Sequence, residues 1–178
     1  FVGGDPAALL TEVVGSPGAS PEEVVRAQTL LGDIHLGRSR VSLAEAAYGE
    51  ALKRQAAPAI AIRLHGLLNA ASRPADADAL AARWLKEHPK DTTMRLYLAE
   101  RDLARKDYRS ASKHYRDLLA IQPQNALVLN NLAWALSERC KVNATLVDLD
   151  LNFGTTGLDF NQDSGATIAD ALMSPDRF

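Results

Sequence analysis

Four leucines recur at a nearly constant spacing, and this spacing limits the fold of the chain more than any other feature. Leu31, Leu64, Leu98 and Leu132 are separated by 33, 34 and 34 residues. Each lies in a segment whose apolar residues are spaced as on one face of a helix, and short breaker segments separate these stretches. A helical unit of this length cannot bury its apolar face alone, so neighbouring units must stack. The spacing therefore predicts an all-α array of helix pairs.

Other residues keep fixed distances from these leucines. The residue after the leucine is small in three units, at Gly32, Ala99 and Ala133, and His65 is the exception. Alanine follows thirteen residues after the leucine, and a tyrosine or alanine follows four residues later, at these positions: Ala44 and Tyr48, Ala77 and Ala81, Ala111 and Tyr115. Helices that cross closely need small side chains at the crossing, because bulk there would force them apart. The pattern thus predicts close contacts within and between the units.

This pattern resembles the tetratricopeptide repeat (TPR) family. The resemblance is clearest in "TTMRLYLAERDLARKDYRSASKHYRDLLAIQP", which carries Leu98, Ala99, Ala111, Tyr115 and Pro123 at the offsets of that family. It implies helix-turn-helix repeats that form a right-handed superhelix, in which the first helix of each pair lines a concave groove. A narrower resemblance, carried by "EHPKD" and "QPQNALVLNNLAW", is to the bacterial periplasmic TPR lipoproteins linked to exopolysaccharide export and the PEP-CTERM sorting system.

The chain is expected to divide into three parts. Residues 1–20 contain the end of a truncated preceding repeat and a linker, residues 21–139 hold a TPR array of about three and a half repeats, and residues 140–178 form a non-TPR tail, extended or partly disordered. Ser20 is expected to cap the first helix of the array. The expected helices lie near 24–38 and 42–55, 58–71 and 74–87, 92–105 and 108–121, and a lone first helix lies near 125–138.

Helix periodicity and the family resemblance together indicate which side chains face the groove. The residues expected to bind a partner there are Arg63, Asn69, Leu96, Tyr97, Glu100, Asn130, Asn131 and Trp134. Thr29, Leu30, Asp33 and Leu36 stand at the same positions of the first helix of the array. In TPR proteins that bind extended peptides, an asparagine directly before the repeated leucine pairs with the peptide backbone, and Asn131 matches that position.

Two neighbouring asparagines in mid-helix are unusual, because the asparagine side chain competes for backbone hydrogen bonds. Asn130 and Asn131 either serve a ligand, or are solvated, or bond to a neighbouring helix, and the sequence leaves these alternatives open. Tyr97 and Trp134 are open in the same way, since an aromatic residue at helical spacing is more often a packing residue than a ligand contact.

Composition and motifs argue against several classes of function. Twenty basic and twenty-two acidic residues give a net charge of −2, which leaves no electrostatic footprint for nucleic acid or an anionic membrane. No apolar run approaches the roughly 20 residues of a membrane span. The histidines lack metal-ligand spacing, so surface or packing roles are expected for His35, His65, His88 and His114. The charges of "AERDLARKDYR" are expected on a solvated helix face. We therefore expect no enzyme, no catalytic residue and no cofactor.

The tail after Cys140 departs from the repeat pattern. Leu149, Leu151 and Phe153 alternate with polar residues, as in an extended segment. The stretch "DFNQDSGATIAD" places oxygen-bearing side chains at positions one, three, five and twelve of a calcium-type loop, namely Asp159, Asn161, Asp163 and Asp170. Ser164 replaces the turn glycine of such loops, so a polar flexible tail is the alternative to a calcium site.

The expected function is that of a non-enzymatic interaction scaffold, which binds an extended peptide or a partner protein in the concave groove. The narrower resemblance would place it in the periplasm or at the outer membrane, within an exopolysaccharide export or protein-sorting system. Two alternatives stay open, an accessory TPR domain of a larger enzyme such as a glycosyltransferase, and a self-association module. The chain's own tail is a further candidate occupant of the groove.

Overall fold

The computed structural model describes residues 5–140, and this part of the chain contains eight α-helices and no strand. The helices are α1 (Pro6–Gly15), α2 (Pro21–Gly37), α3 (Val41–Arg54), α4 (Pro58–Ala70), α5 (Pro74–Glu87), α6 (Thr92–Ala104), α7 (Tyr108–Ile121) and α8 (Ala126–Cys140). The predicted all-α fold is confirmed for these residues, and α2 to α8 begin and end within three residues of the predicted bounds. α2 begins three residues early, because Ser20 and Glu23 form a capping box at its start.

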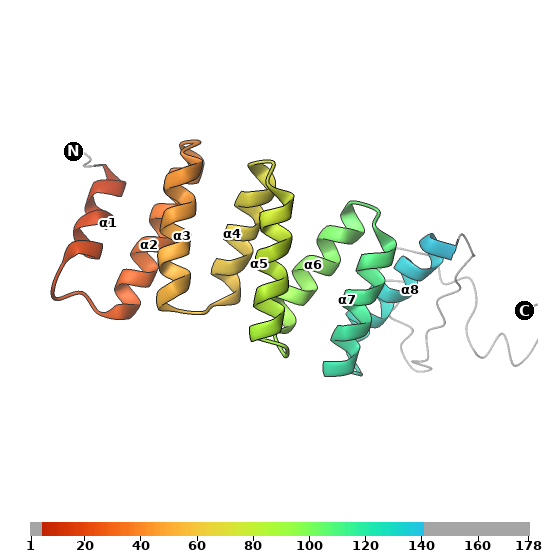
Figure 1. Ribbon diagram of the computed structural model, residues 1–178. Coiled ribbons are helices and arrows are strands. Elements are labelled where there is room, and N and C mark those ends of the chain that lie inside the picture. The colour runs from red at the N-terminus through yellow and green to blue at the C-terminus, as the bar shows by residue number, and fades with distance from the viewer. Residues whose placement is uncertain (1–4, 141–178) are drawn as a thin grey trace, which may run out of the picture.

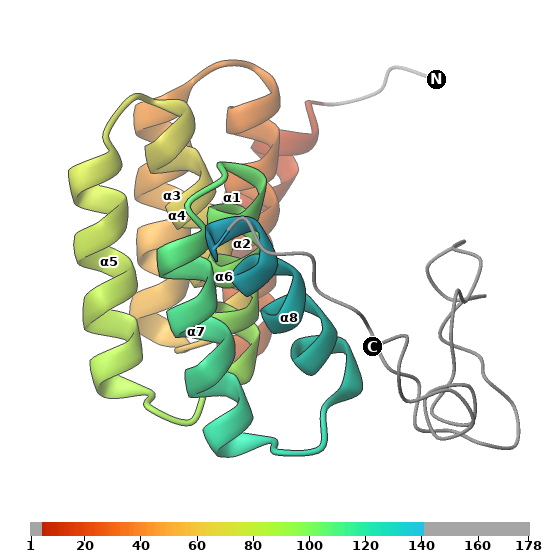
Figure 2. The same cartoon turned by 90° about the vertical axis from the view of Figure 1, so that its right-hand side faces the viewer.

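The helices follow one another along the molecule in chain order (Figure 1). Each packs against the next helix in the chain, and α4 also contacts α6. Seen end-on, α5 lies on one side of the array and α8 on the other (Figure 2). The first helices of the pairs are α2, α4, α6 and α8, and we call the side that they form the first-helix face. None of the helices in the described residues is long and apolar enough to cross a membrane.

The turn inside each helix pair has the same backbone conformation. One residue of the turn has a positive φ, and the next amide donates to a carbonyl five residues earlier, which is the Schellman closure of a helix. The three positive-φ residues are Ser39, Ser72 and Lys106, with φ of 57°, 59° and 61°. The three closing bonds run from Arg40 to His35, from Arg73 to Leu68 and from Asp107 to Asp102, at 2.8, 2.9 and 2.8 Å. The repeat seen in the sequence is therefore also a repeat of backbone structure.

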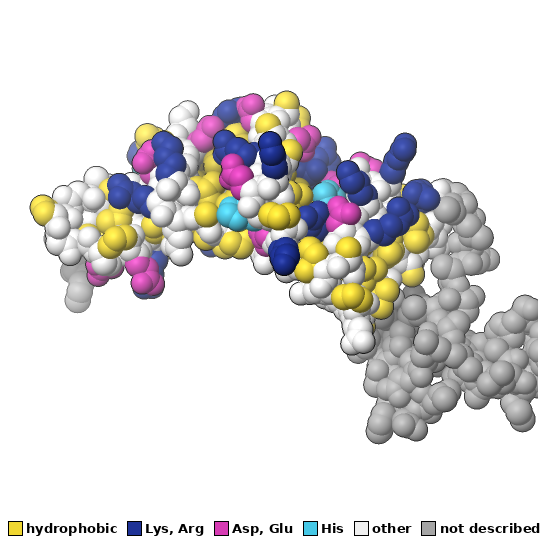
Figure 3. Space-filling model, turned by 60° about the horizontal axis from the view of Figure 1, so that its bottom comes forward, with side chains coloured by type: hydrophobic (Ala, Val, Ile, Leu, Met, Phe, Trp, Pro, Cys, Tyr) yellow, Lys and Arg dark blue, Asp and Glu magenta, His cyan; other side chains and the backbone are white. Residues whose placement is uncertain are grey.

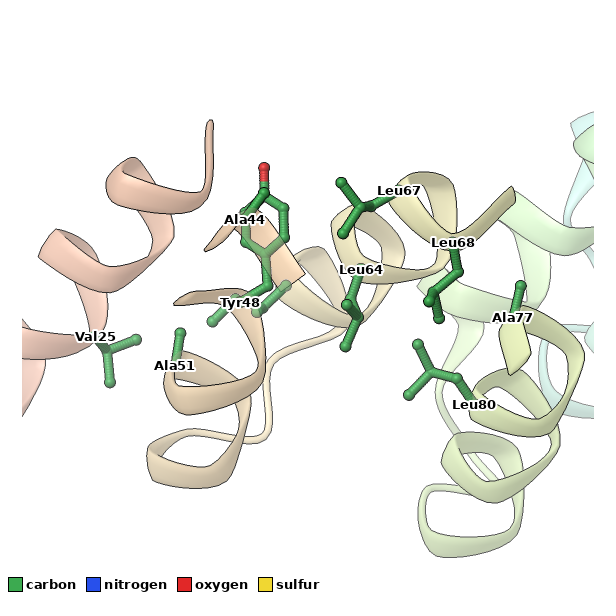
Figure 4. Packing of buried hydrophobic residues seen from close by; sticks show 10 residues of the cluster. Val25, Ala44, Tyr48, Ala51, Leu64, Leu67, Leu68, Ala77 and Leu80 are labelled. Atoms are coloured by element: carbon green, nitrogen blue, oxygen red, sulfur yellow. The ribbon is translucent and has the colours of Figure 1, made fainter. Parts of the chain in front are cut away.

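A buried tyrosine ring packs against a small residue in the first pair of helices. Tyr48 of α3 is completely buried, in a cluster with Leu64 and Leu67 of α4 (Figure 4). A Cβ atom built at Gly32 of α2 would overlap the Tyr48 ring. Gly32 is therefore required by the ring that lies against it.

The size pattern is reversed in the second pair of helices. Ala81 of α5 stands at the position of Tyr48, and His65 of α4 stands at the position of Gly32. Both side chains are buried, and His65 has no exposed surface. In the third pair Tyr115 and Ala99 restore the order of large and small, and both are completely buried. His65 and Ala81, the two exceptions to the sequence pattern, thus exchange large and small side chains at equivalent positions.

Replacing Gly32 by alanine should destabilise the protein by about 1–3 kcal/mol, because the added methyl group overlaps the Tyr48 ring. Gly49 is the matched control, since it lies inside α3 and a Cβ atom there meets nothing within 4 Å. Gly49→Ala should raise stability by about 0.5–1 kcal/mol, the usual gain of alanine over glycine in a helix. Urea denaturation followed by circular dichroism measures both, and equal effects of the two substitutions would contradict the packing described.

Candidate partner-binding face

Polar side chains join neighbouring helix pairs at equivalent junctions. At the first junction the Tyr48 hydroxyl donates to Oδ1 of Asp33 at 2.6 Å, and Nε of Arg63 donates to the same oxygen at 3.2 Å. Burial, and then the hydrogen bond to Asp33, raise the pKa of Tyr48, so its hydroxyl stays a donor. Arg63, predicted to bind a partner, is thus engaged in joining α4 to α2 and α3.

Glu100, Tyr115 and Asn131 occupy the equivalent positions at the last junction. The Asn131 side chain approaches the buried Tyr115 hydroxyl, which makes no hydrogen bond of ordinary geometry within the described residues. Burial raises the pKa of Tyr115, the neighbouring Asn131 amide lowers it, and the charge of Glu100 raises it. Asn131 therefore meets the neighbouring helix α7, which was one of the alternatives that the sequence left open.

The middle junction takes its tyrosine from a different helix. Gly66 and Ala81 stand at the positions of Asp33 and Tyr48, and Tyr97 stands at the position of Arg63. The Tyr97 hydroxyl lies 2.9 Å from Nδ1 of His65, and the two rings meet edge to face with their centres 5.3 Å apart. A Cβ atom built at Gly66 would lie 3.8 Å from the Tyr97 hydroxyl. Tyr97 thus fills space that a tyrosine of the second helix fills at the other junctions.

A buried polar network extends from this junction into the next pair. Nη1 of Arg101 lies 2.8 Å from Nε2 of His65, and Nε and Nη2 of Arg101 donate to Oδ1 of Asp102 at 3.1 and 2.9 Å. Since an arginine can only donate, Nε2 of His65 must accept and the ring proton must lie on Nδ1, where it is donated to Tyr97. The Asn69 amide then donates to the main-chain oxygen of His65 at 2.9 Å. This geometry requires a neutral imidazole.

The network was only partly foreseen from the sequence. The packing role expected for His65 is confirmed by its complete burial. The solvated face expected for the charges of "AERDLARKDYR" is wrong for Asp102, whose exposed fraction is 4%. Arg101 compensates the buried carboxylate from the adjacent position, and Nε2 of His114 lies 3.8 Å from it. A charge count along the helix could not show this, because the burial of Asp102 depends on its neighbours from other helices.

Six of the eight predicted partner-binding residues lie at or near these junctions. Three of them contact other helices, namely Arg63, Tyr97 and Asn131, and Asn69 bonds to the backbone of its own helix. Glu100 lies beside Tyr115. Leu96 is half-buried against the apolar cluster of α6, α7 and α8. The remaining two, Asn130 and Trp134, lie on α8. Asn130 is half-buried, whereas 54% of Trp134 is exposed.

Exposed apolar side chains mark both ends of the first-helix face. On α8, Leu127 is 53% exposed and precedes Trp134 by seven residues, so the two side chains share one side of the helix with Asn130 and Asn131 between them. On α2, Leu30 and Leu36 are 47% and 40% exposed. Figure 3 shows hydrophobic side chains gathered toward the end of the molecule that carries α8. The sequence allowed Trp134 to be either a packing residue or a ligand contact. Since the described residues leave 54% of it exposed, it is not a buried packing residue among them.

No group of three or more His, Cys, Asp or Glu side chains that could hold a metal ion is found within the part of the chain that the structure describes. The calcium loop predicted from Asp159, Asn161, Asp163 and Asp170 lies outside the described residues, and so does the tail segment around Leu149, Leu151 and Phe153.

Comparison with known protein families finds no family that matches this chain, and comparison with curated proteins finds no similar sequence. The tetratricopeptide resemblance, and the narrower resemblance to exopolysaccharide-associated lipoproteins, therefore stay predictions from the sequence pattern.

Stability should fall as the pH is lowered from about 6.5 toward 4. Burial, and then the charge of Arg101, lower the pKa of His65 from 6.5 to about 4, so the unfolded chain binds more protons than the folded chain in this window. Urea denaturation at several pH values measures the slope, which should be smaller in His65→Gln. His88→Gln is the control, since His88 lies at the end of α5 outside the network, and it should keep the slope of the wild type. Parallel slopes in the wild type and His65→Gln would contradict the network described.

Proposed function

We propose that the protein is a non-enzymatic interaction scaffold, which binds an extended peptide segment of a partner protein along the first-helix face. The observation that carries this proposal is the exposure of Trp134, a large aromatic side chain that shares one side of α8 with Leu127 and the two asparagines. Tryptophan at a surface is enriched among the residues that dominate the binding energy of protein interfaces. The peptide therefore begins or ends at α8 and runs across α6 and α4 toward α2.

Apolar contacts should set the affinity, and the asparagines should set the register of the peptide. Burying an exposed leucine or tryptophan contributes about 1.5–3 kcal/mol, whereas a net amide hydrogen bond contributes about 0.5–1.5 kcal/mol. The Asn130 side chain makes no hydrogen bond with another described residue, so its amide can both donate to and accept from a peptide backbone. Asn131 shares its amide between Tyr115 and the ligand.

The junction residues have a supporting part in this proposal. Arg63 and Tyr97 join α4 to α2 and to α6, whereas Asn69 bonds to the backbone of its own helix α4. We place these three residues in the middle of the first-helix face. A rigid face lowers the entropy lost on binding. In the tetratricopeptide superhelix that we infer from the sequence, this face is concave. The most specific part of the proposal is the assignment to a bacterial exopolysaccharide export or protein-sorting system, and it rests on sequence resemblance alone.

Selection of linear peptides from a phage-displayed library on the wild-type protein tests the proposal. Peptides recovered on the wild type should bind Trp134→Ala at least tenfold more weakly, because the aromatic anchor is lost. Leu9→Ala is the matched control, since Leu9 is as exposed as Trp134 but lies on α1 at the other end of the array, and it should leave the affinity unchanged. Fluorescence anisotropy with labelled peptide measures these affinities. Equal binding by wild type and Trp134→Ala would sink the proposal.

A further inference from the structure

A cavity lies away from the first-helix face, between the second helices of the first two pairs. It has a volume of about 360 Å3 and is lined by residues of α3, α4 and α5. Its apolar walls are Leu52 of α3, Leu64 of α4, and Leu80 and Trp84 of α5. Figure 4 shows Leu64 between the side chains of α3 and Leu80. Cavities that hold small molecules have volumes of about 300–1,000 Å3 and mostly apolar walls, so this one is large enough for a small ligand.

Gly49 of α3 lines the same cavity and has no other evident role in the fold. Glycine inside a helix is destabilising relative to alanine. Gly32 is explained by the Tyr48 ring, but a Cβ atom at Gly49 would meet nothing within 4 Å. The equivalent positions of α5 and α7 carry side chains, Ala82 and Arg116. The absence of a side chain at Gly49 therefore leaves the cavity open.

The charges at the rim favour an anionic head group. Lys53 of α3 and Arg83 of α5 stand on opposite walls, and Glu87 is the one carboxylate among the lining residues. Lys53 is bound to Glu50 at 2.7 Å in an exposed pair, which is readily exchanged, and Arg83 makes no ion pair with any residue between 5 and 140. Two cationic groups therefore face one carboxylate at the opening.

The interior of the cavity exposes no unpaired polar group of its lining residues that a ligand would have to bind. Nε1 of Trp84 donates to Asp91, so the indole presents only its apolar ring surface to the cavity. None of the buried polar atoms without a hydrogen bond in the described residues belongs to a lining residue. An apolar chain or ring can thus fill the interior without leaving a buried polar group unpaired.

We propose that this cavity binds a small amphiphilic acid, with its apolar chain between α3 and α5 and its carboxylate at Arg83 and Lys53. The site is separate from the partner-binding face, so it stands or falls independently of the proposed function.

Tryptophan fluorescence tests the site with a terminally brominated decanoate as the probe, because bromine quenches an indole that it contacts. The chain has two tryptophans, so Trp134→Phe leaves Trp84 as the only tryptophan, whose emission is followed by excitation at the red edge of the absorption band, where tyrosine does not absorb. We expect saturable quenching in this background. Gly49→Leu should weaken binding at least tenfold by filling the cavity, whereas Arg116→Leu, the same side chain at the equivalent position of α7, should leave it unchanged. Thermal unfolding checks that Gly49→Leu is folded, and Ala56→Phe at the other rim is a second blocking variant.

The brominated alcohol of the same chain length tests the head group. It should bind at least fivefold more weakly than the acid, and Arg83→Gln should reduce the affinity for the acid to that for the alcohol. Quenching that does not saturate, or that is equal in Gly49→Leu, Ala56→Phe and the parent, would overturn the site. Equal affinity for acid and alcohol would overturn the assignment of an acid as the ligand.

Discussion

The rest of the structure depends on one interaction, the close contact of an aromatic ring with a small residue. This contact lies where the two helices of one pair meet the first helix of the next pair. Within residues 5–140 the helices mainly contact their neighbours in the chain, and α4 also contacts α6, so these helices share no central core that could compensate for a loose junction. Tyr48, Tyr97 and Tyr115 each supply a ring at such a junction. Since stability in a stacked array is a sum of such neighbour interactions, a defect at one ring separates the array into two parts.

The middle junction shows how the same volume can be filled by different residues. Ala81 leaves space that a tyrosine fills elsewhere, and His65 and Tyr97 enter from the two flanking first helices. The exchange brings an imidazole into the interior, and each nitrogen of a buried imidazole needs a hydrogen-bond partner. Arg101 and Tyr97 satisfy these nitrogens, and they do so only for the neutral imidazole. The pH dependence expected from His65 is thus a consequence of a packing exchange.

The repeat made the helices predictable, and it also limited what the sequence could say about the site. Equal spacing fixes the register of each helix, so the bounds of α2 to α8 follow from the positions of leucine, alanine and proline. Periodicity gives the direction of a side chain from its own helix, but not its distance to the next helix. Arg63, Tyr97 and Asn131, which were predicted to face the groove, contact a neighbouring pair of helices. Comparing Asp33, Tyr48 and Arg63 with their equivalents two units later could have revealed the junctions, because an acid, a tyrosine and a polar residue recur there together.

The glycines inside the helices differ in whether the packing of the protein explains them. Each is destabilising compared with alanine, so each calls for a compensating contact or a use. Gly32 lies under the Tyr48 ring, and Gly66 lies beside the Tyr97 hydroxyl. The Tyr48 ring requires glycine at position 32, whereas a Cβ atom at Gly66 would meet the Tyr97 hydroxyl in ordinary van der Waals contact. A Cβ atom at Gly49 would meet nothing within 4 Å, and Gly49 borders a cavity that no described residue fills. We infer that the proposed ligand, rather than the packing of the helices, accounts for Gly49, and this inference does not depend on what binds at Trp134.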